Sequence, residues 1–190
     1  MKPTPVAVID ACVLYSAALR DLIMWLNIRL VFQPKWTDKI HSEWIENLLR
    51  NRPDLTREKI ERTRDLMNLW GRDWQTPEHE EIISSLVLPD PGDRHVLAAA
   101  IASNSFLIVT FNVSDFPKSA LEEHAVIAVH PDAFFCELLD QDQSLFISAV
   151  KDQLDSLRNP PHTLNDLLAK FRKERIPNLA DKLEKLHEEL

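Results

Sequence analysis

Short runs of apolar, mostly β-branched residues alternate with amphipathic segments along most of this chain, and this alternation constrains its fold most strongly. Residues 5–10 (PVAVID) form an apolar run that ends at an acid, and similar short runs occupy residues 30–32, 106–110 and 126–129. Runs that are apolar on both faces are typical of strands in a parallel sheet with both faces covered. We therefore expect an α/β fold with a central parallel sheet.

Apolar residues at helical spacing predict helices between and after these strands. The expected helices comprise one or two over 11–30, one capped by Thr37 or Asp38, one from Thr56 to about Trp70, one over 95–103, one over 131–139, one over 143–157 and one from 163 to the end. We divide the chain into a domain over residues 1–140 and a helical extension over 141–190. Leucines at helical spacing in the extension need a cover, which could be the domain itself, a second copy or a partner protein.

The composition argues against several classes of protein. No apolar run approaches the roughly 20 residues of a membrane span, and the first one breaks at Asp10, too early for a signal peptide. We therefore expect a cytoplasmic protein. The net charge of −8 argues against an indiscriminate nucleic-acid binder. Cys12 and Cys136 belong to no Cys/His cluster, which favours two buried thiols over a zinc site.

Acidic residues follow the predicted strands or open the helices between them. Asp10 ends the first strand, and Asp115 lies in the loop after the strand at 106–110. Glu43 lies on the helix after the second strand, while Asp90 and Asp93 precede the alanine-rich helix at 95–103. Ligands of open parallel sheets bind at the carboxyl ends of the strands, so the fold could bring these acids to one edge.

A gathering of carboxylates points to a divalent cation. Several carboxylates within a few ångströms repel one another unless a counter-ion is present. Mg²⁺ prefers oxygen ligands and keeps several waters, and it can activate one of them and stabilise phosphate oxygens during a displacement. An acid set without thiol or imidazole therefore indicates phosphodiester chemistry.

Each acid also has an ordinary structural interpretation. Asp10 could cap the helix that follows it, and Asp93 is placed like an N-cap before the next helix. Glu43 could be a solvated helix residue. Asp90 between two prolines is typical of a turn, and Asp115 could cap a turn. The prediction of a site therefore rests on the combined pattern.

These residues lie in motifs that resemble the PIN-domain family, and most closely its bacterial VapC-like toxin ribonucleases. The matching pieces are VIDACVL around Asp10, TDKIHSE ending at Glu43, PDPGDRHVLAAA around Asp93 and VTFNVSDF around Asp115. Their order and spacing fit the family over about residues 5–135, and the last two pieces are the most specific. The chain departs from a minimal PIN toxin in its helical extension and in having only 2 glycines.

The resemblance implies a three-layer α/β/α PIN-like domain and an endoribonuclease that depends on Mg²⁺ or Mn²⁺, the toxin of a type II toxin–antitoxin pair. It implies an RNA substrate, a small antitoxin protein that blocks the acidic cleft, and a homodimer. The residues expected to bind metal and catalyse are Asp10, Glu43, Asp93 and Asp115. Residues expected around them are Asp90, Thr110 and Asn112.

Several residues outside the acid set could also contact RNA. Arg94 could meet a phosphate as a charged fork, whereas His41 and His95 are more commonly plain helix residues. The basic stretch over 50–64 could bind an RNA backbone, or it could be a solvated helix face with i,i+4 pairs such as Glu58–Arg62. The five tryptophans could stack on bases, but most are expected in the core: Trp25, Trp36, Trp44, Trp70 and Trp74.

Two other functions compete with the nuclease. A non-catalytic PIN module could bind RNA or protein through the same fold, although nothing in the sequence breaks the acid pattern. An acid-cluster phosphohydrolase of the haloacid-dehalogenase type would need Asp-x-Asp after the first strand. Asp10 is followed by Ala11 and Cys12, so this function is disfavoured.

Overall fold

A single parallel sheet organises the chain, as the sequence predicts. The computed structural model describes residues 4–76, 79–158 and 160–186. The strands β1 (Val6–Ile9), β2 (Gln33–Lys35), β3 (Leu107–Val109) and β4 (Ile127–Val129) lie in the order β2-β1-β3-β4. In the central pair, Ile9 lies opposite Val109. Residues 7–9 of β1 are completely buried, which explains why this strand carries no polar side chain.

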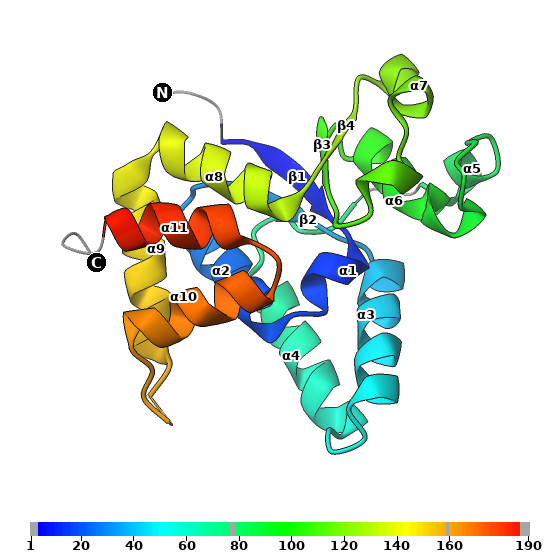
Figure 1. Ribbon diagram of the computed structural model, residues 1–190. Coiled ribbons are helices and arrows are strands. Elements are labelled where there is room, and N and C mark those ends of the chain that lie inside the picture. Colours follow the sequence, from blue (N-terminus) through cyan, green and yellow to red (C-terminus); the bar gives the residue numbers. More distant parts are fainter. Residues whose placement is uncertain (1–3, 77–78, 159, 187–190) are drawn as a thin grey trace.

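Helices lie on both sides of the sheet, which confirms the three-layer α/β/α architecture (Figure 1). α6 packs against β1 and β3, and α2 packs against β2. No helix in the described ranges is long and apolar enough to cross a membrane. The helices are α1 (Ala11–Leu14), α2 (Ala17–Ile28), α3 (Asp38–Asn51), α4 (Arg57–Trp70), α5 (Glu80–Ile83), α6 (Arg94–Ala102), α7 (Lys118–Leu121), α8 (Pro131–Gln141), α9 (Gln143–Ser156), α10 (Leu164–Lys173) and α11 (Pro177–Lys185), with 3-10 turns at Pro91–Asp93, Val113–Asp115 and Glu122–His124.

The predicted position of the second strand was wrong by three residues. Residues 31–32 are buried in the connection that leads into β2, where the Phe32 ring meets Phe134 edge-on, with their centroids 5.1 Å apart. The strand itself carries Gln33 and Lys35, both polar. Val31 and Phe32 are apolar because they are buried beside the strand, and this apolar run led to the prediction of a strand at residues 30–32.

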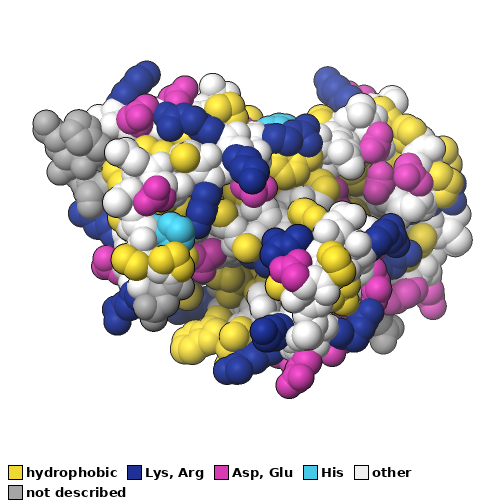
Figure 2. Space-filling view, turned by 60° about the horizontal axis from the view of Figure 1, so that its bottom comes forward, with side chains coloured by type: hydrophobic (Ala, Val, Ile, Leu, Met, Phe, Trp, Pro, Cys, Tyr) yellow, Lys and Arg dark blue, Asp and Glu magenta, His cyan; other side chains and the backbone are white. Residues whose placement is uncertain are grey.

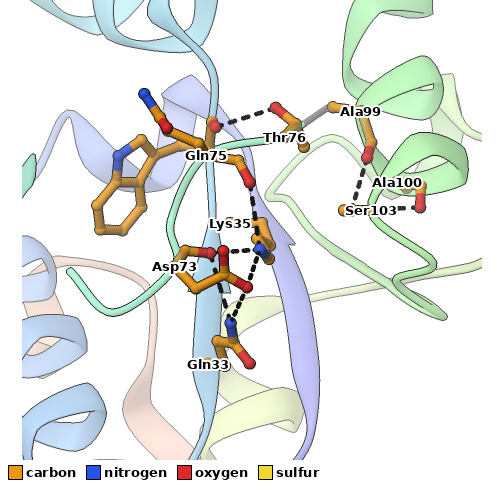
Figure 3. A network of polar contacts seen from close by, with 9 residues as sticks. Gln33, Lys35, Asp73, Gln75, Thr76, Ala99, Ala100 and Ser103 are labelled. Carbon is orange, nitrogen blue, oxygen red and sulfur yellow. Dashed lines mark hydrogen bonds and ion pairs between the residues drawn. The ribbon is translucent and has the colours of Figure 1, made fainter. Parts of the chain in front are cut away.

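β2 tolerates polar residues because a loop covers its free edge. Lys35 donates to the carbonyl and carboxylate of Asp73 and, at 3.2 Å, to the carbonyl of Gln75. Gln33 donates to the same carboxylate at 3.0 Å (Figure 3). Trp36 and Gln75 form an isolated parallel bridge, and the Thr76 hydroxyl donates to the Trp36 carbonyl. Residues 73–76 thus satisfy backbone and side-chain groups of the edge strand.

A buried aromatic and amide network joins α3 to α4. Thr37 caps α3, as predicted, by accepting from the backbone N–H of Ile40. Asn68 Oδ1 lies 2.9 Å from both Trp36 Nε1 and His41 Nε2. Burial lowers the pKa of His41, so its ring is neutral and Nδ1 accepts from the indole of Trp44. His41 therefore has a structural role, in line with the plain helix interpretation.

The helical extension folds back on the domain, which selects one of the three covers considered from the sequence. Leu167, Phe171 and Leu183 are completely buried. Asp132 on α8 accepts from the backbone N–H groups of Asn178 and Leu179 at the start of α11, at 3.1 and 2.9 Å. The single helix predicted from residue 163 onward was wrong, because the chain breaks between α10 and α11 before continuing at Pro177.

Asp21 on α2 makes the stability of the fold depend on pH. Burial raises the pKa of Asp21 to about 6 from its ordinary value of 3.8, against the opposing effects of Gln153 and Arg20. A carboxyl group whose pKa is higher in the folded than in the unfolded chain stabilises the fold at pH values below its unfolded-state pKa. This contribution is lost as the pH rises through its folded-state pKa. We expect Asp21→Asn to raise the free energy of unfolding at pH ~7 by roughly 1–3 kcal/mol.

Denaturant titrations of the wild type and Asp21→Asn across pH check this expectation. The difference should vanish below pH ~4, where both side chains are neutral. Asp93 also has a raised pKa, so only the difference between the two proteins isolates Asp21. A difference that does not change with pH would contradict the assignment.

Candidate active site

The first predicted site residue, Asp10, lies at the carboxyl end of the central strand pair. Its backbone N–H donates to the Val109 carbonyl at 3.1 Å, which continues the pairing of β1 with β3. This register places Asp10 beside Thr110, whose hydroxyl donates to Asp10 Oδ2 at 2.7 Å. Thr110 is completely buried and Asp10 is 6% exposed. The sheet therefore fixes one carboxylate at the edge where ligands of parallel sheets bind.

The Asp10 carboxylate does not cap the helix that follows it, although Asp10 occupies the N-cap position of α1. It accepts instead from Thr110 and, at 3.1 Å, from the thiol of Cys12. Burial and the adjacent carboxylate raise the pKa of Cys12 to about 12, so the sulfur stays protonated and donates. The sequence predicted only a buried thiol for Cys12, and its position two residues after Asp10 is the one signal that could have indicated this contact.

Asp93 is the carboxylate with the clearest electrostatic signature. It occupies the N-cap position of α6 but makes no capping hydrogen bond, so the predicted cap is wrong. Burial raises the pKa of Asp93 to about 6, with further contributions from the carboxylates of Asp10, Asp90 and Asp115. Two of the other predicted acids, Asp10 and Asp115, thus lie within electrostatic range of Asp93. Asp90 accepts from the Gly92 N–H at 2.7 Å, as a turn residue does.

Glu43, the fourth predicted acid, meets the same helix from α3. Its Oε1 lies 2.9 Å from Nε2 of the buried His95, a distance that allows an ion pair when the ring is protonated. Neither ring nitrogen of His95 makes a hydrogen bond of ordinary geometry within the described residues, and Nε of Arg94 is likewise buried without one. His95, expected to be a plain helix residue, therefore links α6 to Glu43.

Asn112 precedes the 3-10 turn after β3, and Asp115 is the last residue of that turn. The Asn112 backbone N–H donates to the Thr110 hydroxyl at 3.0 Å, while its side chain makes no capping bond. Asp115 is half-buried and accepts from Ser114 at a long 3.4 Å. Its carboxylate thus has no strong partner among the described residues, and it contributes to the electrostatic field at Asp93.

The donor chemistry of this edge fits a hard divalent cation. All four predicted acids offer carboxylate oxygens, and the mutual repulsion felt at Asp93 is the kind that a cation relieves. Within the described ranges, no three His, Cys, Asp or Glu side chains lie close enough together to hold one ion. The carboxylates thus occupy one region of the sheet edge without forming a closed cage.

The molecular surface is mixed in charge despite the net charge of −8. Figure 2 turns the lower side of Figure 1 forward and shows a face that is hollowed near its centre, with Lys and Arg side chains on both sides of the hollow. Several arginines of the basic stretch are paired, as in Arg52–Asp54, Arg57–Glu46 and Arg64–Asp65. These pairs favour the solvated-face interpretation for the arginines concerned, and they are other pairs than the predicted Glu58–Arg62.

Comparison with known protein families decides the classification. The profile of the PIN domain matches residues 6–114, a range that includes Asp10, Glu43, Asp93 and the start of the turn at Asp115. This chain belongs to the PIN domain family. A second profile, the VapC50 C-terminal domain, matches residues 131–185. The PIN domain and the helices after it thus both have counterparts in known families.

A bacterial relative supports the VapC-like character of this PIN protein. The protein named "Putative ribonuclease VapC50" from Mycobacterium tuberculosis is 36% identical over 94 residues, which is 50% of this chain. The match spans 55% of that relative's own length. No solved structure matches the PIN chain significantly.

Proposed function

We propose that this PIN protein is an endoribonuclease that requires Mg²⁺ or Mn²⁺ and hydrolyses RNA phosphodiester bonds at Asp10, Glu43, Asp93 and Asp115. The observation that carries the proposal is the position of Asp10. It ends the central strand, turns its carboxylate away from the helix it could cap, and accepts from Thr110 across the strand pair. A buried acid held in this way at the ligand-binding edge of a PIN sheet is pre-organised for cation binding.

The four acids form the metal site in this proposal. Asp10, Asp93, Asp115 and Glu43 bind the cation, and Glu43 reaches the acidic edge from α3. A bound Mg²⁺ or Mn²⁺ lowers the pKa of a coordinated water and neutralises charge on the phosphate. Thr110 holds the Asp10 carboxylate in one orientation through its 2.7 Å hydrogen bond. In this proposal the exposed Asn112 and the half-buried Arg94 contact RNA through an amide and a guanidinium, and Asp90 supports the loop that carries Asp93.

The similarity to a VapC-named relative extends the proposal to partners. We propose that the chain is the toxin of a type II toxin–antitoxin pair, that it acts in the cytoplasm as a homodimer, and that a small antitoxin blocks the acidic edge. The proposed division places the nuclease domain in residues 1–140 and the helical extension in 141–190.

Cleavage of a mixed tRNA and mRNA pool tests the proposed chemistry. The wild type should cut RNA with Mn²⁺ and stop when EDTA removes the metal, and Asp93→Asn should be inactive under both conditions. RNA cleavage that persists in EDTA would contradict the proposal. Absence of cleavage by the wild type with Mn²⁺ on the whole pool would favour the non-catalytic PIN module.

A further inference from the structure

A short connection between α10 and α11 brings the helical extension to the acidic edge. Glu174, Arg175 and Ile176 form this connection. The Arg175 guanidinium lies over the Phe111 ring, with Cζ 4.7 Å from the centroid. Phe111 directly follows Thr110, and in Figure 1 the connection points toward α1 and the end of β1. The extension therefore reaches the part of the sheet that carries Asp10.

Three contacts link Arg175 to the Asp10 carboxylate, and the first is its contact with the Phe111 ring. The Phe111 backbone N–H donates to Cys12 Sγ at 3.3 Å, and Cys12 Sγ donates to Asp10 Oδ2 at 3.1 Å. Arg175 thus lies on the ring of the residue that follows Thr110, and this chain of contacts links it to the Asp10 carboxylate.

The backbone at Arg175 is one that glycine would favour. Arg175 has φ 65°, in the left-handed region. Its N–H donates to the Arg172 carbonyl at 3.2 Å, and the Ile176 N–H donates to the Phe171 carbonyl at 3.0 Å, so the residue occupies the usual glycine position of a Schellman motif. Other non-glycine residues of this chain also have positive φ, so the strain alone assigns no role. The position of the side chain is the informative feature, because the guanidinium lies over Phe111, just after the end of β3.

Two neighbouring cations are already neutralised, whereas Arg175 is not. Arg172 pairs with Asp181 and Glu184, and Lys182 pairs with Asp140. Within residues 4–76, 79–158 and 160–186, no carboxylate pairs with Arg175, and the residue is exposed. The side chain borders an open concavity of about 720 Å³ that is also lined by His130 and Asn178. A free guanidinium beside such a space is suited to bind a phosphate.

We propose that Arg175 binds a backbone phosphate of single-stranded RNA next to the acidic edge, so that the helical extension forms part of the substrate site. This inference rests on the proposed ribonuclease function and adds a residue to it. An arginine on an aromatic ring is held in place by the ring and can bind a phosphate by charge. In this arrangement the acidic edge binds one part of the RNA strand, and Arg175 binds the adjacent phosphate.

RNA binding, measured without cleavage, tests this role. All variants carry Asp93→Asn, and fluorescence anisotropy follows a short labelled single-stranded RNA of mixed sequence. We expect Arg175→Gln to weaken binding by about five- to tenfold and to reduce the slope of log affinity against log salt by about 0.7, the value of one phosphate contact. Arg175→Lys should restore most of the affinity because it keeps the charge.

Two controls separate a direct contact from a change in folding. Arg172→Gln removes an arginine that lines the same concavity but is paired with Asp181 and Glu184, so it should change the affinity by less than about twofold. Arg175→Gly suits the left-handed backbone, so it should unfold at an equal or higher denaturant midpoint while still losing affinity.

The role of Arg175 would be overturned if Arg175→Gln kept the wild-type RNA affinity and salt slope. It would also be overturned if Arg172→Gln lost as much RNA affinity as Arg175→Gln, or if the protein with Asp93→Asn alone bound no RNA. Because cleavage is not the readout, a protein that binds RNA through Arg175 but never cuts it would contradict only the proposed function.

Discussion

Asp10→Asn is expected to reduce metal-dependent RNA cleavage by at least about 100-fold, since it removes the charge of the most firmly positioned acid. The substitution keeps the shape of the side chain and an oxygen that can accept from Thr110. The fold should therefore persist while the chemistry is lost. Initial rates with Mn²⁺ on the RNA cut by the wild type provide the measurement.

Asp142→Asn is the matched control for this substitution. Asp142 lies at the N-cap of α9 and accepts from the Leu145 N–H at 3.0 Å. Asparagine is an equally good N-cap, so the same change of charge is made far from the sheet edge at little cost in stability. Cleavage by Asp10→Asn at the rate of Asp142→Asn would remove Asp10 from the proposed site.

Phe171→Ala is expected to lower the free energy of unfolding by about 3–5 kcal/mol, as for other completely buried aromatic residues. The Phe171 ring is 0% exposed in the core that α10 shares with the rest of the chain. α10 contacts α2, and α11 contacts α8, so the extension and the domain should unfold in one transition. Denaturant titration followed by tryptophan fluorescence and by circular dichroism measures both expectations.

Leu69→Ala provides the comparison for Phe171→Ala. Leu69 on α4 is 73% exposed, and its truncation should change the free energy of unfolding by less than about 0.5 kcal/mol. A separate, earlier transition for the extension in Phe171→Ala, or a loss as small as that of Leu69→Ala, would show that the extension is not part of the common core.

The sequence predicted those helices and strands whose residues have one clear physical requirement, such as burial on both faces or a helix cap. β1 and β3 were found because both faces of a central strand are buried and apolar, and Thr37 and Thr56 were found because they cap helices. β2 was misplaced because an edge strand covered by Asp73 can be polar. The break at Arg175 was missed because the usual signal, a glycine, is absent there.

The candidate site was predicted as a set of acids, whereas their surroundings were not. The motifs named Asp10, Glu43, Asp93 and Asp115, but no local rule indicates that two residues at N-cap positions leave their caps unmade. That outcome depends on the pairing of β1 with β3, which brings Thr110 and Cys12 to Asp10. The same dependence on tertiary contacts hid the position of Arg175 over Phe111.

Calorimetric titration of the protein with Mn²⁺ tests the central claim most directly, since it needs no knowledge of the RNA target. The wild type and Asp142→Asn should bind Mn²⁺ with the same affinity, and Asp10→Asn and Asp115→Asn should each bind at least about tenfold more weakly. Equal Mn²⁺ affinity in all four proteins would contradict the claim that these carboxylates form a metal site.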